Sequence, residues 1–443
     1  MEPIKVTAIF DIGKTNKKFF LFDQELKEVY KVYHRLDYIQ DEDGEDCESI
    51  QALTQWVRQT LKEALSLPQF LIVKLNFTTY GASFVHIDQM GNPVAPLYNY
   101  LKKYPEDILA QFYAKYGPAE KFSQETSSPA LGMLNSGLQL YWLKYAKPDI
   151  FKKIHRSLHL PQYLSFLFTG KIVSEYTSIG CHTGLWDFAK GDYHHWVKAE
   201  GIDKILPEVV DTTTSFAKTF DRHSMSVGVG VHDSSSALLP YLTSNTEPFA
   251  LLSTGTWAIS INPFNDTQLT LDELRKDCLH FLSKEGRPIK ISRLFIGEEH
   301  KVQIEELYTH FQLEKGYYKA LCFEKERYDK AKSKTCKRFR FEYLKPEVYG
   351  LTQATATDWK DFADFEDAYY SFIHELTDLQ VASLSLVLNG STSVKKLYID
   401  GGFNANPIFV EMLRDKLPGI SVETTDFALG TALGAGMLVN DLA

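Results

Sequence analysis

The chain has 443 residues, too many for one ordinary hydrophobic core, so we expect two or three domains. Its composition, 44% hydrophobic and 24% charged, is typical of a soluble globular protein. The net charge of -9 at pH 7 argues against a general nucleic-acid binder, and no segment has the apolar length needed to span a bilayer. We therefore predict that neither nucleic acid nor membrane is a partner.

The N-terminus and the cysteines indicate the compartment. Met1 leads into a strand-like stretch, Val6 to Phe10, without the regions of a signal peptide, which predicts a cytoplasmic protein. The cysteines are scattered and none has Cys-x-x-Cys spacing, which disfavours a disulfide framework and a zinc site. The five are Cys47, Cys181, Cys278, Cys322 and Cys336. We interpret them as buried or incidental thiols.

Residues 8–22 predict a β-hairpin with a polar turn. The turn offers backbone N–H groups, a hydroxyl and an amide, a combination suited to phosphate oxygens, and Asp11 just before it could hold a hydrated Mg²⁺. The turn residues are Gly13, Lys14, Thr15 and Asn16. A Walker A loop is rejected, because Ala8 stands where that motif needs a glycine and a hairpin follows in place of a helix. A plain hairpin turn is the alternative.

A third strand is expected at 28–33, a solvated acidic loop at 41–46 and a helix at 48–65. The next strand, 70–77, ends in the small and hydroxylated residues 78–83. Open α/β sheets bind ligands at the carboxyl ends of their strands, so this stretch is a candidate site. A simple turn around Gly81 is the alternative.

Helices are expected from Leu138 past Pro148 and over 161–168, and Trp142 and Trp186 are assigned to the core. The pair His194-His195 predicts no metal site, because adjacent imidazoles on one helix point in different directions.

The stretch 228–237 reads Gly-Val-Gly-Val-His-Asp-Ser-Ser-Ser-Ala and leads from a strand to a helix N-terminus. Asp233 is the candidate catalytic base at this junction. A carboxylate that only caps the helix is the alternative.

Residues 249–261 repeat the hairpin pattern, with Ser253, Thr254, Gly255 and Thr256 at the tip. Two similar hairpins suggest a duplication, in which two α/β lobes face each other across a phosphate-binding cleft.

The last third of the chain contains a charged segment, 314–345, which we interpret as a solvated insertion, with a basic rim that steers an anion as the alternative. A long amphipathic helix is expected at 365–388 and a strand at 395–400. That strand runs into Gly401 and Gly402, where backbone can approach a flat ligand. Residues 429–436 form a small-residue helix suited to close packing.

Four of these stretches, in this order, resemble the FGGY family of carbohydrate kinases, and within it the rhamnulokinase-like branch. They are the hairpin with Asp11 and Gly13, the His232-Asp233 element, the hairpin Ser253 to Trp257, and the Gly401-Gly402 turn. The resemblance covers nearly the whole chain. It implies an α/β fold with two actin-like, ribonuclease H-like lobes and an ATP and sugar cleft, with residues 1–240 as the sugar-binding lobe and 241–443 as the nucleotide-binding lobe.

The resemblance also implies an ATP- and Mg²⁺-dependent phosphorylation of a small sugar, such as the ketoses L-rhamnulose, L-fuculose or a ketopentose. Asp233 would be the general base, with Asp11 and Asp233 near the magnesium. The implied nucleotide-binding residues are Gly13, Lys14, Thr15, Asn16, Lys17, Lys18, Thr254, Gly255, Thr256, Gly401, Gly402 and Asn406. The implied sugar-binding residues are Gly81, Ala82, His232, Asp233 and Ser234.

Some positions depart from the family pattern. Lys17-Lys18 stand where an arginine is frequent, and the sequence from Tyr98 to Lys103 replaces a usual sugar-contact sequence. A catalytically weak homologue that senses sugar or nucleotide is the alternative to an enzyme. A homodimer is expected only from the general frequency of dimers.

Overall fold

The computed structural model describes residues 2–389, 394–425 and 429–442, and the chain divides into two compact units. Unit 1 contains Met1–Thr246, His280–Pro288 and Leu429–Ala443, and unit 2 contains Glu247–Leu279 and Ile289–Ala428. The predicted division between residues 240 and 241 differs from this one. The chain enters unit 1 twice more after its N-terminal part, which a single cut cannot describe.

Unit 1 is built on a seven-stranded sheet in the order β13-β14-β6-β1-β2-β3, with β15 also paired to β6. The pairs β1/β2 and β2/β3 are antiparallel, whereas β1 and β6 are parallel. The strands are β1 (Ile4–Ile12), β2 (Lys17–Phe22), β3 (Glu28–His34), β6 (Phe70–Thr79), β13 (Ser215–Phe220), β14 (His223–Gly228) and β15 (Val231–His232). The hairpin predicted at residues 8–22 is confirmed.

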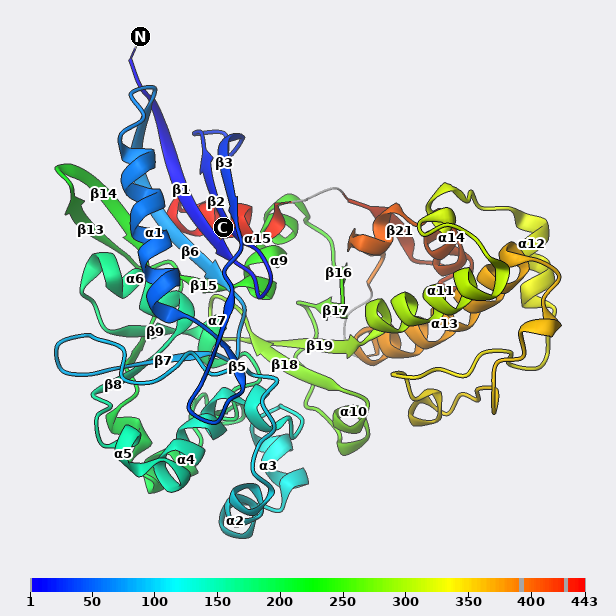
Figure 1. Cartoon of the computed structure of the whole chain (residues 1–443), viewed down its shortest axis with the longest axis horizontal. Helices are drawn as coiled ribbons and strands as arrows, with labels where there is room; N and C mark the ends of the chain where they lie inside the picture. Colours follow the sequence, from blue (N-terminus) through cyan, green and yellow to red (C-terminus); the bar gives the residue numbers. More distant parts are fainter. Residues whose placement is uncertain (1, 390–393, 426–428, 443) are drawn as a thin grey trace. The chain divides into compact units, whose positions relative to one another are not determined.

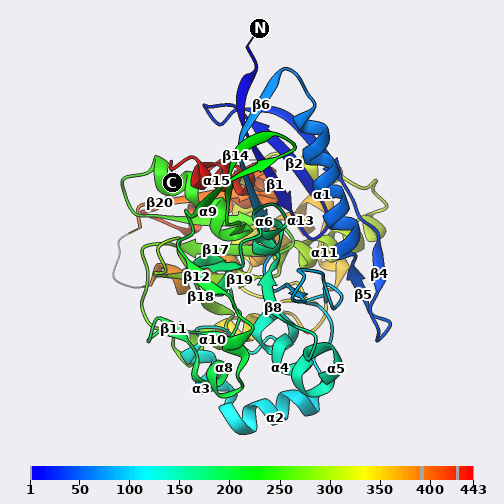
Figure 2. The same cartoon turned by 90° about the vertical axis from the view of Figure 1, so that its left-hand side faces the viewer.

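Helices cover both faces of this sheet, because successive residues of a strand point to opposite sides. Phe10 of β1 packs with helices α1 (Ile50–Leu65) and α6 (Leu160–Thr169). Its neighbour Ile9 packs with α9 (Asp233–Ser244) and α15 (Gly430–Val439) on the other face. Figure 2 shows α1 and α15 on opposite sides of these strands. The predicted α/β class is confirmed for this unit.

Helix α15 joins unit 1 through its small residues. A Cβ placed at Gly434 would overlap the carbonyl oxygen of Ser236 in α9, and the Ser236 hydroxyl donates a hydrogen bond of 2.7 Å to the carbonyl of Thr431. The close packing predicted for residues 429–436 is confirmed, and its partner is the helix that begins with Asp233.

Unit 2 contains most of a six-stranded sheet in the order β18-β19-β17-β16-β20-β21; residues 280–282 of β18 and Pro288 of β19 belong to unit 1. The strands are β18 (Cys278–Leu282), β19 (Pro288–Leu294), β17 (Ala258–Asn262), β16 (Phe249–Thr254), β20 (Lys396–Gly401) and β21 (Ser421–Thr424). Its main helices are α11 (Ile296–Phe311), α12 (Lys325–Lys332), α13 (Phe365–Leu388) and α14 (Pro407–Lys416), and Figure 1 shows α11, α13 and α14 side by side. The antiparallel pair β16/β17 confirms the second predicted hairpin, and α13 coincides with the predicted helix.

The other predicted helices are present as α4 (Ser136–Ala146), α5 (Pro148–Phe151) and α6, and Trp142 and Trp186 are buried as predicted. The acidic loop differs from its prediction. Asp41 is buried and accepts a hydrogen bond of 2.5 Å from the Lys102 ammonium, so this loop is partly structural. Among the described helices, none combines the length and the hydropathy that a membrane span requires.

Candidate functional site

Asp233 lies where a strand ends and a helix begins. Strand β15 pairs in parallel with β6, so that His232 lies beside Thr79, and α9 starts at the next residue. The capping residue of α9 is His232, whose side chain makes no capping bond. Asp233 Oδ1 accepts from the adjacent backbone N–H of Ser234 at 2.6 Å and not from a later residue of the first turn. Its carboxylate is therefore not the side-chain cap, and it stays 28% exposed.

Burial raises the pKa of the Asp233 carboxyl to about 6, although the hydrogen bonds from Ser234 and the charge of Lys18 act in the opposite direction. A general base works best when its pKa lies near the working pH, because it must be ionised and still accept a proton. Asp233 therefore has the ionisation that proton abstraction from a hydroxyl requires.

The raised pKa gives a stability prediction. The unfolded carboxyl titrates near 3.9, so between about pH 4 and pH 6 the folded chain holds the extra proton, and stability falls as the pH rises through this window. Above pH 6, the ionised Asp233 carboxylate lowers the free energy of unfolding by about 1–3 kcal/mol. We expect Asp233→Asn, which cannot ionise, to unfold at a higher temperature than the natural chain at about pH 7.5 but not at about pH 4. Calorimetry without added Mg²⁺ tests this, and an equal difference at both pH values contradicts it.

Asp11, at the end of β1, is close to Asp233. Asp11 Oδ2 accepts from the Lys18 ammonium at 3.2 Å and from the Thr431 hydroxyl of α15 at 3.0 Å. Burial raises the pKa of Asp11, and the charge of Asp233 raises it further, while Lys18 and Thr431 lower it. Two carboxylates that repel each other form a donor set of hard oxygens that suits Mg²⁺. The residues present therefore fit the magnesium that the sequence implied.

The first turn is closed by its own backbone and by Lys17, the first residue of β2. The Gly13 N–H donates to the Asn16 carbonyl at 3.0 Å and closes the turn. Lys17 is 1% exposed, and its ammonium donates to the carbonyls of Gly13 and Lys14 and pairs with Glu48 at 2.8 Å. Lys17 therefore stabilises the turn from inside, which corrects the prediction that it binds phosphate directly. Asn16 is engaged too, since its Oδ1 accepts from the Arg35 guanidinium at 3.0 Å.

The predicted sugar-binding residues come together after β6. A Cβ at Gly81 would lie 2.9 Å from Cys181 Sγ and 3.1 Å from His232 Nε2, so a larger residue would have to displace these side chains. The next residue, Ala82, has a positive φ of 58°, and its carbonyl accepts from Gln139 Nε2 at 2.9 Å. The loop is thereby fixed beside His232.

His232 orients this side of the site. Its Nε2 lies 3.2 Å from Asp233 Oδ1 and 3.1 Å from Cys181 Sγ, and its Nδ1 lies 3.2 Å from Ser235 Oγ. Burial lowers the pKa of His232 to about 3, so the ring is neutral. Cys181 is buried, in agreement with the prediction of buried or incidental thiols, but nothing in its sequence context indicated a contact with His232.

The second hairpin and the glycine turn lie together in unit 2. They line a pocket of about 540 Å³ that includes Gly255, Thr256, Gly402 and Asn406. Two of the predicted nucleotide ligands have internal roles. The Thr254 hydroxyl donates to the carbonyl of Asp400 at 2.5 Å, and the Asn406 side chain accepts from Phe409 N–H at the start of α14 and donates to the Tyr369 hydroxyl.

The pocket lining also includes Lys301, Lys315 and Lys319. Lys301 pairs with Glu298 at 2.8 Å, and Lys315 pairs with Glu305 at 2.7 Å. Lys301, in α11, was not predicted from the sequence, whereas Lys315 and Lys319 lie in the charged segment 314–345. Further along this segment, Lys330 pairs with Asp367 at 3.0 Å and Lys332 pairs with Asp415 at 2.6 Å. These ion pairs agree with the interpretation of the segment as a solvated insertion.

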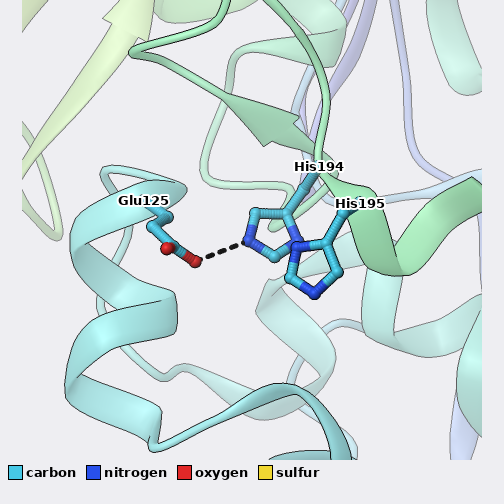
Figure 3. A group of neighbouring side chains, drawn as sticks. All are labelled: Glu125, His194 and His195. Atoms are coloured by element: carbon cyan, nitrogen blue, oxygen red, sulfur yellow. Dashed lines mark hydrogen bonds and ion pairs between the residues drawn. The ribbon is translucent and has the colours of Figure 1, made fainter.

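Glu125, His194 and His195 have the composition of a metal centre, and their ligand atoms lie within 4.8 Å of one another (Figure 3). The predicted divergence of the two imidazoles is wrong, because His194 precedes helix α8 (His195–Ala199) and the rings lie 4.3 Å apart. However, His194 Nδ1 accepts from the Trp196 N–H at 3.4 Å, so Nε2 carries the proton and donates to Glu125 at 2.9 Å. A metal would need that protonated nitrogen, so the cluster is a helix cap secured by Glu125.

Comparisons with known proteins agree with this geometry. A family model described as the FGGY family of carbohydrate kinases, N-terminal domain, matches residues 6–239. A rhamnulokinase from Halalkalibacterium halodurans is 26% identical over 265 residues, which are 56% of this chain and 52% of that protein. The chain spans about half the length of the curated relatives it matches.

Solved structures match over most of the chain. A carbohydrate kinase from Novosphingobium aromaticivorans aligns with a TM-score of 0.77 at 23% identity, over 98% of this chain and 93% of that one. The ligand-bound xylulose kinase from Lactobacillus acidophilus aligns with a TM-score of 0.76 at 14% identity, over 99% and 89%. These likenesses confirm the predicted fold.

Proposed function

Because the chain belongs to the FGGY family of carbohydrate kinases, we propose that it transfers the γ-phosphoryl group of ATP to a hydroxyl of a small sugar. The observation that carries the proposal is Asp233, a partly exposed carboxylate with a pKa of about 6 at the N-terminus of α9, beside Lys18 and Asp11. A carboxylate with this ionisation can accept the proton of the attacking hydroxyl.

The other residues have positioning roles. Gly13, Thr15 and Lys18 would contact phosphate oxygens, and His232, Gly81, Ala82 and Ser234 would surround the acceptor. Asp11 and Asp233 would hold Mg²⁺, which supplies charge neutralisation to the phosphoryl group when bound. Gly255, Thr256 and Gly402 would line the nucleotide site in unit 2. Such positioning accounts for most of the catalysis in phosphoryl transfer.

The experiment is coupled ADP release with ATP and Mg²⁺ over a panel of sugars. The ketoses L-rhamnulose, L-fuculose, D-xylulose and L-ribulose come first, followed by aldoses and polyols. We expect a single strong responder. If no sugar responds although ATP binds, a sensor of sugar or nucleotide replaces the enzyme as the better account. The cytoplasmic location and the homodimer stay predictions.

A further inference from the structure

The Lys14 ammonium lies in an aromatic cage in unit 1. Its nitrogen is 5.1 Å from the ring centre of Tyr100, 5.3 Å from that of Tyr80 and 5.6 Å from that of Tyr38. The ammonium therefore faces three electron-rich rings, an arrangement that holds a cation in place while leaving its N–H groups for hydrogen bonding. The Lys14 side chain stays 19% exposed.

The cage has more positive than negative charge. Glu48 lies 2.8 Å from the Lys17 ammonium and 3.4 Å from that of Lys14, so one carboxylate serves two cations. Lys17 uses all its N–H groups on Glu48 and two backbone carbonyls. Among the described residues, Glu48 is the one carboxylate paired with Lys14, and that pair is the longer of the two. Lys14 therefore has hydrogen-bonding capacity left for an anion.

The incompletely paired charge of Lys14 lowers the stability of the folded protein, and an uncharged residue at this position would avoid that loss. Burial lowers the pKa of Lys14, against the effect of Glu48, which means that the ammonium is incompletely compensated. A Met or Leu side chain would pack on the same three rings without this desolvation penalty. A cation that is costly to the free protein is a candidate for ligand binding.

The cage adjoins the proposed acceptor site through two of its rings. Tyr80 lines a small cavity together with Gly81 and His232. Burial raises the pKa of the Tyr100 phenol to about 12, and the negative charge of the nearby Asp233 carboxylate contributes to this increase. Tyr100 also belongs to the segment 98–103, in which two other side chains contact the acidic loop 41–46. Tyr98 donates to Glu42 at 2.6 Å, and Lys102 pairs with Asp41.

We infer that the acceptor is a sugar acid, whose carboxylate pairs with Lys14 while one of its hydroxyls lies at Asp233. This inference rests on the proposed function and names the substrate class. An anionic oxygen at Lys14 could instead belong to the nucleotide phosphates. We favour the acceptor, because the rings around Lys14 border the loop of Gly81 and the Asp233 carboxylate.

The test is calorimetric binding to the full chain without nucleotide, using matched pairs of ligands. D-gluconate, D-xylonate and L-rhamnonate are each compared with glucitol, xylitol and L-rhamnitol, which carry CH₂OH in place of the carboxylate. We expect at least one acid to bind roughly 10- to 100-fold more tightly than its polyol, the range of a hydrogen bond to a charged group. Equal binding of acids and polyols, or no binding of any acid, overturns the inference.

Variants separate the possibilities. Lys14→Met should remove the preference for the acid, Lys14→Arg should keep it, and Lys5→Met, an exposed position with the same change of charge, should leave it intact. If Lys14→Met weakens ATP binding and leaves the acid preference unchanged, Lys14 serves the nucleotide and the inference is wrong. If the protein phosphorylates a neutral sugar and Lys14→Met does not change that rate, the inference is wrong but the proposed kinase activity is supported. Acid binding that depends on Lys14 without any phosphoryl transfer supports the inference and contradicts the kinase.

Discussion

Replacing Asp233 with asparagine should lower phosphoryl transfer by roughly 10²- to 10⁴-fold, the usual contribution of a general base, and leave acceptor binding nearly unchanged. The amide has the size of the carboxylate, and its oxygen can still accept the N–H of Ser234, which Asp233 Oδ1 accepts at 2.6 Å. It cannot take up the proton of the attacking hydroxyl. Initial rates of ADP release and calorimetric binding of the acceptor measure the two effects separately.

The matched control for this variant is Asp203→Asn, which makes the same chemical change at an exposed position of unit 1. It should keep the full rate. If Asp233→Asn retains more than about a tenth of the activity, Asp233 is not the base, since even a modest general base contributes more than this. A loss of acceptor binding in parallel with the rate would instead indicate a positioning role.

Replacing Gly434 with alanine should destabilise unit 1 by about 2–3 kcal/mol, because the added methyl group overfills a packed interface. Its Cβ would overlap the Ser236 carbonyl oxygen and lie 2.9 Å from Ser236 Oγ. Helices α9 and α15 would have to separate. Since α9 begins with Asp233 and the Thr431 hydroxyl of α15 bonds Asp11, activity should fall as well. Thermal unfolding followed by tryptophan fluorescence measures the change in stability.

Gly436 provides the control within the same helix. A Cβ there would meet Leu26 at 3.5 Å, an ordinary contact, so Gly436→Ala should stabilise the chain by about 0.5–1 kcal/mol through helix propensity. The two variants are thus expected to shift the unfolding temperature in opposite directions. Equal shifts would show that α15 does not pack on α9 as described.

Local pattern was enough to predict the elements that carry the site. Runs of hydrophobic residues on both sides of a polar, glycine-containing turn predicted the hairpins of β1/β2 and β16/β17, and the apolar stripe of residues 365–388 predicted α13. Asp233 was predicted from its place between a strand and a helix. These features depend on neighbours within a few residues, and the sequence displays them directly.

Contacts between distant residues could not be predicted in this way. The hydrogen bond from Thr431 to Asp11 joins opposite ends of the chain. Lys17 was predicted to bind phosphate, but its ammonium is buried in its own turn and pairs with Glu48. Likewise, the proximity of His194 and His195 depends on where α8 begins, a boundary that composition does not fix. In each case the decisive partner lies outside the local pattern.

The central claim is phosphoryl transfer to a sugar, and the most direct measurement follows the phosphoryl group itself. The protein is incubated with ATP labelled in the γ-phosphoryl group, Mg²⁺ and a pool of ketoses and sugar acids, and the products are separated by mass spectrometry. We expect the label in one sugar phosphate with the natural chain and in none with Asp233→Asn. Label that remains in ATP, or that appears only as inorganic phosphate, would contradict the proposed kinase.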